Sequence, residues 1–324
     1  MSLGAARVVD DAIEEYIAKY SNWGRWGDSD ELGAVNLISR SIVRDAAHGV
    51  KSGRVVGLGL PFDQNGPQTG AYGRMNCLRY STATGVEHET GVQTLLGQPA
   101  PHGFGYADDV VVLGLQSATH WDALSHIFHS GRMYNGRPAS TVTTDGAAHC
   151  GAEVWRENLV GRAVLLDVPS TLGVDTLPDG HAIDADQLDA AAEFGKVEIR
   201  EGDILLLRTG RLKRGREEGW GAYAGGDAPG LSYYSIPWLA SHGIAAVASD
   251  TWGVEVRPNE FPDSFQPFHI PALVYMGLML GEMFDFERLA EACAEEGRYE
   301  VFFSAPPLAV TGSVGGPPGP VAIL

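Results

Sequence analysis

The stretch Gln116–His129, QSATHWDALSHIFH, follows the apolar run Val110–Leu115, VVVLGL. This run is rich in β-branched residues and has the length of a buried strand. We therefore expect it to be a strand of a parallel sheet. The polar residues that follow it should then lie at the edge where such sheets form their sites. The stretch thus predicts both an α/β fold and the place of a functional site within it.

Three polar side chains of this stretch have the spacing of a metal site. His120 and Asp122 are two residues apart and share a face if the backbone is extended. Asp122 and His126 are four apart and share a face if the chain turns helical after Asp122. Imidazole and carboxylate groups suit a divalent cation such as Zn²⁺ or Mn²⁺, and a further histidine remains for proton transfer. The competing interpretation is structural, because His-x-Asp also occurs by chance and histidines near strand ends are often hydrogen-bonded core residues.

The same stretch resembles the signature of the cyclase family, which contains kynurenine formamidases and isatin hydrolases. The family motif is His-x-Gly-Thr-His-x-Asp-x-x-x-His, and the residues that match it are Thr119, His120, Asp122 and His126. Gln116 stands where the family has its first histidine, and Ala118 stands where it has glycine. An amide oxygen binds such metals more weakly than imidazole. The departure therefore affects which metal binds and how tightly, but not where the site lies.

Later segments resemble the family as well. These are Arg208-Thr209-Gly210, Asp250-Thr251-Trp252 and Ser313–Pro318, together with His269, which precedes a helical turn and a strand that ends near Glu282. In the family, such a histidine and glutamate complete the metal site. The resemblance implies that one or two Mn²⁺ or Zn²⁺ ions are held by Gln116, His120, Asp122, His269 and Glu282. From the residues alone, His269 would be a capping or core residue and Glu282 a solvated acid.

Two tryptophans, Trp23 and Trp26, lie in the glycine-containing segment NWGRWGD. Such a segment is either a packing plug or one wall of a substrate pocket, and the residues alone favour the plug. Longer members of the cyclase family carry a similar segment. The resemblance therefore makes Trp23 and Trp26 candidates for substrate binding.

Hydrophobic periodicity predicts a succession of helices and strands. Helices are expected over 9–20, 39–50, 185–194, 235–242 and 286–296, and strands over 54–60, 161–168, 202–210, 243–249 and 276–280. Their alternation after Gly161 predicts an α/β domain with a mixed sheet. The resemblance, from about Trp23 onward, implies a single cyclase-like domain over 1–324 with the swivelling β/β/α fold. Residues 62–107 lack a period, which predicts an insertion of short strands and turns that forms a lid or an arm onto a second subunit.

The charge of the chain limits its partners. The 23 Lys and Arg against 41 Asp and Glu give a net charge of −18, which repels nucleic acids and anionic membrane surfaces. No apolar run reaches the roughly 18 residues that span a bilayer. A nucleotide-binding Gly-x-x-x-x-Gly-Lys motif and a Gly-x-Ser-x-Gly elbow are both absent. We expect a small-molecule substrate and, from the resemblance, a homodimer or higher homo-oligomer.

The cysteines indicate the compartment. Cys77, Cys150 and Cys293 are far apart and have no zinc-finger spacing, so we expect no disulfide framework and a cytoplasmic protein. Cys150 follows His149, but a chance neighbour pair is a better interpretation than a catalytic one.

These features lead to one main functional hypothesis. We expect a metal-dependent hydrolase that cleaves an amide C–N bond in a cyclic amide or an N-formyl compound. His126 would take a proton from water and return it to the leaving nitrogen. Two alternatives remain open: a metal-dependent cyclase or dehydratase, and a relative that has lost catalysis and binds a small ligand.

Overall fold

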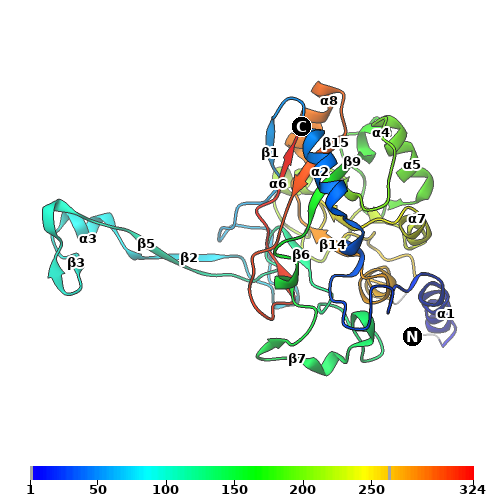
Figure 1. Cartoon of the computed structure of the whole chain (residues 1–324), viewed down its shortest axis with the longest axis horizontal. Coiled ribbons are helices and arrows are strands. Elements are labelled where there is room, and N and C mark those ends of the chain that lie inside the picture. The colour runs from blue at the N-terminus through cyan, green and yellow to red at the C-terminus, as the bar shows by residue number, and fades with distance from the viewer. Residues whose placement is uncertain (1–2, 262–263) are drawn as a thin grey trace.

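A computed structural model of the chain describes residues 3–261 and 264–324. It consists of a body built around a mixed nine-stranded sheet and a long arm that projects from this body (Figure 1). The strand order is β1-β17-β15-β9-β11-β13-β14-β6-β16. The strands are β1 Val55–Gly57, β6 His120–Asp122, β9 Val160–Asp167, β11 Ile204–Arg208, β13 Ala246–Ser249, β14 Met279–Glu282, β15 Glu300–Ser304, β16 Gly315–Gly316 and β17 Val321–Ile323. The expected α/β fold with a mixed sheet is confirmed.

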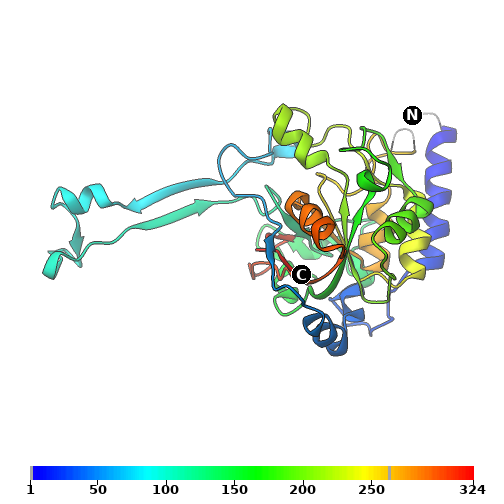
Figure 2. The same cartoon turned by 90° about the horizontal axis from the view of Figure 1, so that it is seen from above.

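The four strands β9, β11, β13 and β14 run parallel at the centre of the sheet. They are almost entirely buried, which explains their continuous apolar sequences, because helices and loops cover both faces of such a sheet. Helices lie around the sheet of this body (Figure 2). They are α1 Leu3–Tyr20, α2 Arg40–His48, α4 Val168–Thr171, α5 Ala185–Phe194, α6 Arg211–Glu218, α7 Ile236–Ser241 and α8 Glu287–Glu296.

The predicted helices and strands of the body are all present, with shifts at their ends. The helix expected over 185–194 begins and ends at the predicted residues. Its N-terminus is capped by Asp184, whose side chain accepts a hydrogen bond from the amide of Gln187. The turn expected after His269 is the π-helical segment Ile270–Met276. Short 3₁₀ turns occupy Gly33–Leu37, Ala71–Gly73, Pro101–Gly103, Tyr134–Gly136, Ala139–Thr141, Ala152–Trp155 and Tyr233–Ser235. Two-stranded pairs are formed by β7 Val142–Thr143 with β8 Gly146–Ala147, and by β10 Ala182–Ile183 with β12 Gly230–Leu231. None of the described helices is both long enough and apolar enough to cross a bilayer.

One end of the sheet brings the signature stretch to the last parallel strand. Strand β6 pairs antiparallel with β14, so that His120 lies opposite Glu282 and Trp121 lies opposite Gly281. Alternation along β6 then places His120 and Asp122 on one face and Trp121 on the other. The Trp121 ring is fully buried, packs 5.0 Å from the Phe284 ring and donates its Nε1–H to the Ala305 carbonyl at 2.9 Å. Burial of the indole therefore fixes the direction in which its two polar neighbours point.

The arm is formed by the antiparallel strands β2 Leu78–Ala83 and β5 Asp108–Val112. Its outer part contains α3 Gly85–Glu89, β3 Thr94–Leu95 and β4 Gln98–Pro99. The short strands and turns expected over 62–107 are present, and most of that segment belongs to the arm (Figure 1).

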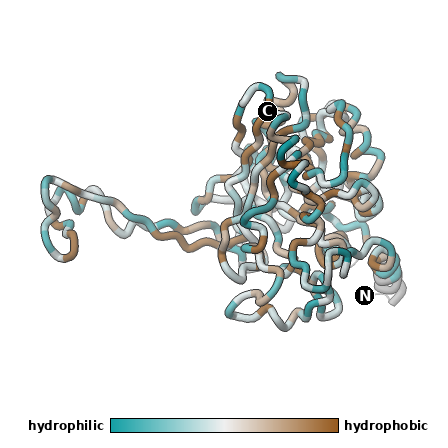
Figure 3. The backbone as a smooth tube through the Cα atoms, viewed as in Figure 1, coloured by the Kyte–Doolittle hydropathy of each residue, from teal (hydrophilic) through white to brown (hydrophobic). Residues whose placement is uncertain are grey.

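The buried parallel strand expected over 110–115 is a wrong prediction. The segment Val110–Val112 is extended, but it lies in the arm, and its residues are 46–54% exposed. Hydrophobic stretches follow the arm near the body and at its tip (Figure 3). A β-branched apolar run specifies an extended backbone, but not which surface, if any, will cover it. The functional stretch consequently begins at an antiparallel strand, β6, and not at the end of a parallel one.

Candidate metal centre

Two strands supply three buried side chains that could hold a metal ion. His120 and Asp122 on β6 and Glu282 on β14 place one donor atom each within 4.8 Å of the others. The His120 Nε2 atom is 3.3 Å from Asp122 Oδ1 and 3.4 Å from Glu282 Oε2. His269 joins them from the start of the π-helical segment, with its Nε2 3.6 Å from Glu282 Oε1 and 3.9 Å from Asp122 Oδ2. The structure thus brings together four of the five ligands that the resemblance implied.

The hydrogen bonding of His120 shows that these residues fit a cation. Its Nδ1 lies 2.8 Å from the Ala118 carbonyl oxygen, which can only accept, so Nδ1 carries the proton. In the neutral imidazole the Nε2 lone pair then faces two carboxylates. The buried atoms His120 Nε2, His269 Nε2 and Asp122 Oδ1 all lack a hydrogen-bond partner among the described residues. Buried acceptors that face one another are unfavourable unless a cation or a proton lies between them.

Glu255 is a buried residue in contact with His269 that the sequence analysis did not identify. It is buried, and its Oε1 accepts a hydrogen bond of 2.5 Å from His269 Nδ1. It also accepts bonds from the amides of Phe268 and His269, which start the π-helical segment. This carboxylate therefore holds His269 with its Nε2 toward Asp122 and Glu282, in the way that outer carboxylates commonly orient ligating histidines. Only its place three residues after the Asp250-Thr251-Trp252 segment could have drawn attention to it.

Opposing effects set the charge states of this cluster. Burial lowers the pKa of His269, but the hydrogen bonds and charges of Glu255 and Glu282 outweigh burial and raise it to about 10. Burial disfavours the charged form of Asp122, but the neighbouring histidines, His126 first, hold the pKa of this carboxyl well below its usual range. Asp122 is thus ionised at neutral pH, and a proton on His269 occupies the position that a cation would take.

His126 lies beside the cluster without belonging to a helix. The amide of His126 donates to the Ala123 carbonyl at 2.8 Å, and this single turn places its Nε2 3.8 Å from Asp122 Oδ1. The helix considered after Asp122 does not form, although the expected proximity does. Burial lowers the pKa of His126, so the ring is neutral and able to accept a proton. Its side chain is 21% exposed, against 0% for His120 and 2% for His269, so His126 is the most exposed of these three histidines.

Gln116 is placed differently from the four residues above. Its Nε2 is buried and has no hydrogen-bond partner among the described residues. It lies against β16, where a Cβ added to Gly315 would come within 2.3 Å of it. None of the contacts described for the cluster includes it. Its part in metal binding stays a prediction.

Trp23 and Trp26 also stay predictions as substrate-binding residues. Trp23 donates its Nε1–H to the Val274 carbonyl at 2.7 Å and stacks on Tyr275 at 4.8 Å, so it packs on the π-helical segment. Trp26 lies under the Arg25 guanidinium, 4.8 Å from its carbon. These contacts are those of packing residues.

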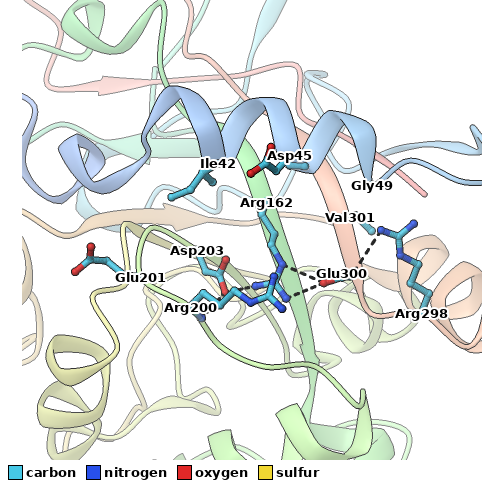
Figure 4. A pocket seen from close by; sticks show the side chains of 11 residues that line it. Ile42, Asp45, Gly49, Arg162, Arg200, Glu201, Asp203, Arg298, Glu300 and Val301 are labelled. Carbon is cyan, nitrogen blue, oxygen red and sulfur yellow. Dashed lines mark hydrogen bonds and ion pairs between the residues drawn. The ribbon is translucent and has the colours of Figure 1, made fainter.

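A separate cavity of about 250 Å³ lies between α2 and the sheet (Figure 4). Arg162 crosses it and bonds to Asp203 at 2.5 Å and to Glu300 at 2.7 Å, while Arg298 lies 3.5 Å from Glu300. None of the residues that line this cavity belongs to the cluster of His120, Asp122, His269 and Glu282. Because acids neutralise these guanidinium groups, we interpret the network as structural.

The burial of Cys150 also decides between the chance and the catalytic interpretations of the pair His149 and Cys150. The Cys150 thiol is fully buried, and burial, together with the charge of Glu31, raises its pKa to about 12. The adjacent His149 points to Glu31, with Nδ1 3.0 Å from Oε1. A thiol that stays protonated is a poor nucleophile, so Cys150 and His149 do not form a catalytic pair.

Comparisons with known proteins agree with this geometry. A family model described as a putative cyclase matches residues 38–256, more than half of the chain. A crystal structure described as a novel cyclase is 32% identical, covers 95% of this chain and 99% of its own, and has a TM-score of 0.85. No curated protein gave a match.

Isatin hydrolases share the fold at lower identity. Isatin hydrolase A from Labrenzia aggregata, bound to benzyl benzoate, is 18% identical, covers 88% of this chain and 98% of its own, and has a TM-score of 0.58. An isatin hydrolase bound to the product analogue thioisatinate is also 18% identical, covers 84% and 92%, and has a TM-score of 0.57. The match over more than half of the chain, together with the 32% identical crystal structure, establishes that this chain is a member of the cyclase family.

Proposed function

We propose that this chain is a metal-dependent hydrolase that cleaves an amide C–N bond in a cyclic amide or an N-formyl small molecule. The observation that carries the proposal is the unpaired, buried Nε2 of His120 between the carboxylates of Asp122 and Glu282. Two imidazoles and two carboxylates form a donor set that suits Zn²⁺ or Mn²⁺, as one ion or as two that share Asp122. When bound, such an ion supplies a Lewis acid that polarises a carbonyl and lowers the pKa of water to about 7.

Residues of the chain hold the ion, orient one of its ligands and transfer the proton. His120, Asp122, His269 and Glu282 hold the ion, and Glu255 keeps His269 oriented. The neutral His126, which is the most exposed of these side chains, accepts a proton from the attacking water. Water oxygen bonds to the carbonyl carbon, the C–N bond breaks, and its electron pair stays on nitrogen. His126 then returns the proton to that nitrogen, which leaves a carboxylic acid and an amine.

Supporting context comes from two further features. Isatin hydrolases, whose name describes the opening of a cyclic amide, share this fold. The three cysteines are buried free thiols, which supports the reducing cytoplasm as the compartment.

The first test is metal analysis of protein purified without chelator, followed by assays on cyclic amides and N-formyl arylamines. We expect near-stoichiometric Mn or Zn that is lost in His120→Ala. His126→Ala should retain the metal and lose turnover by about 10²–10⁴-fold, the usual size of a general-base effect. His48→Ala, on the exposed side of α2, is the matched control and should change neither.

The outcomes separate the proposal from its alternatives. A protein that neither contains nor takes up metal contradicts the hydrolase mechanism. A product that lacks the elements of water identifies a cyclase or dehydratase. Loss of metal in His126→Ala would make His126 a ligand. Metal without turnover in the natural chain, with turnover appearing in Gln116→His, would identify a ligand-binding relative that lost catalysis at position 116.

A further inference from the structure

We propose that Arg74 binds a negatively charged oxygen of the ligand at the metal centre, which makes planar carboxylates the class of product that this site recognises. The reaction that forms such a carboxylate rests on the proposed function, whereas the anion site itself rests only on the geometry around Arg74.

Arg74 is held beside the cluster by an aromatic ring. It follows the turn Ala71–Gly73 at the base of the arm, and its guanidinium carbon lies 4.7 Å from the centre of the Trp252 ring. Its Nη1 is 3.8 Å from Glu282 Oε2. The side chain is 20% exposed, close to the 21% of His126. Arg74 and His126 are thus more exposed than His120, Asp122, His269 and Glu282.

The guanidinium has a free donor where the ligand would lie. Nη1 is buried and has no hydrogen-bond partner among the described residues, because 3.8 Å to Glu282 is too long for a hydrogen bond. The buried Arg208, in contrast, bonds to Asp167 and Glu287 at 2.8–2.9 Å. Leaving a buried charged donor without an acceptor is unfavourable. Such a cost is expected where a ligand later supplies the acceptor.

The nearby carboxylates do not supply the acceptor that Arg74 lacks. Asp122 and Glu282 face the position that a cation would take, and Glu255 bonds on the opposite edge of the His269 ring, to Nδ1, two amides and Asn259. A carboxylate suits Arg74 because the planar guanidinium offers paired donors that match its two oxygens.

Aromatic side chains next to Arg74 suggest the shape of the rest of the ligand. Tyr72 stacks on Trp252 at 5.4 Å and lies 5.5 Å from Phe265. Tyr72 and Phe265 are 62% and 52% exposed. Exposed ring faces beside a cation provide a surface for a planar apolar group attached to the carboxylate.

Benzoate and its neutral isostere benzamide test this site by calorimetry on the metal-containing protein. We expect benzoate to bind more tightly than benzamide. Arg74→Gln should weaken the binding of benzoate at least tenfold and leave the binding of benzamide unchanged. Arg74→Lys should restore part of the benzoate affinity, because lysine keeps the positive charge but lacks the paired donors of the guanidinium. Arg79→Gln is the matched control, since Arg79 pairs with Asp109 on the exposed arm. Metal content is measured for each variant.

The failure of this proposal and that of the hydrolase function give different results. Equal benzoate affinity in the natural protein and in Arg74→Gln contradicts the anion site, even if amides are hydrolysed. Metal loss in Arg74→Gln also contradicts it, because Arg74 would then support Glu282. Benzoate binding that depends on Arg74, in a protein that hydrolyses no amide, supports the anion site and contradicts the hydrolase function.

Discussion

His120 and Glu282 lie opposite one another on two antiparallel strands, with Nε2 and Oε2 3.4 Å apart, and this Nε2 has no hydrogen-bond partner among the described residues. The pair joins the signature stretch to a strand near the end of the chain. A single ion bound by both side chains would remove the repulsion between the two acceptors.

This relationship predicts how two substitutions combine. Glu282→Gln and His120→Ala should each weaken metal binding strongly. The double variant should lose little more than the worse single variant, because both residues act on the same ion. Metal affinity measured by competition with a chelating dye checks this. Additive losses would indicate that the two side chains bind different ions.

Glu255 acts through His269, and its substitution should show this. We expect Glu255→Gln to lower metal affinity about 10–100-fold while the protein remains folded, because an amide holds the His269 Nδ1–H less strongly than a carboxylate does. Glu260→Gln is the control, since Glu260 likewise caps a backbone amide, that of Tyr233, but does not contact a histidine. Equal metal affinity in the two variants would limit Glu255 to helix capping.

Gly281 should be required for the packing that orients β6. A Cβ at this position would lie 2.7 Å from the Trp121 ring and 2.8 Å from the Phe284 ring. Gly281→Ala should therefore lower the free energy of unfolding by roughly 1–3 kcal/mol, the usual cost of overpacking. Gly57→Ala, on the edge strand β1 with open space around it, should have a much smaller effect. Denaturant unfolding of both variants compares them, and equal stability would contradict the packing argument.

Cys150 should be unreactive in the folded protein. Its pKa is raised from the ordinary 9.0 to about 12, so the thiolate at pH 8 is about a thousandfold rarer than for a free thiol. We expect mass spectrometry to find no alkylation of Cys150 by iodoacetamide until urea unfolds the chain. Because the unfolded thiol ionises first, the stability contributed by this residue should fall as the pH rises from about 9 to about 12. Rapid labelling of the native protein would show that Cys150 is more accessible than its burial indicates.

Much of the body could be predicted from the sequence because its signals are local. The apolar runs that became β9 and β11, and the amphipathic spacing of α5 and α8, are properties of short segments. The extended backbone of His120–Asp122 belongs to this class as well, since alternation alone puts both polar groups on one face. For His269 and Glu282 the local pattern was too weak, and the resemblance to the cyclase family supplied the prediction.

Other features depended on contacts that no local pattern encodes. Glu255 matters because the fold sets it against His269, and Arg74 because Trp252 holds it beside Glu282. The run Val110–Val112 satisfies every local rule for a buried strand, but it is exposed in the arm. His126 reaches Asp122 through one turn of loop, although the spacing alone suggested a helix.

The sequence by itself determined which residue types could bind a metal, which segments would be helices or strands, and the family of the chain. Only the tertiary structure decided which of these residues meet. Thr119 and Met283 are 164 residues apart in sequence and are joined by a hydrogen bond of 2.6 Å, next to the pairing of β6 with β14. Such long-range pairing results from the packing of the whole sheet around Trp121 and Phe284, because local backbone preferences cannot choose between distant partners.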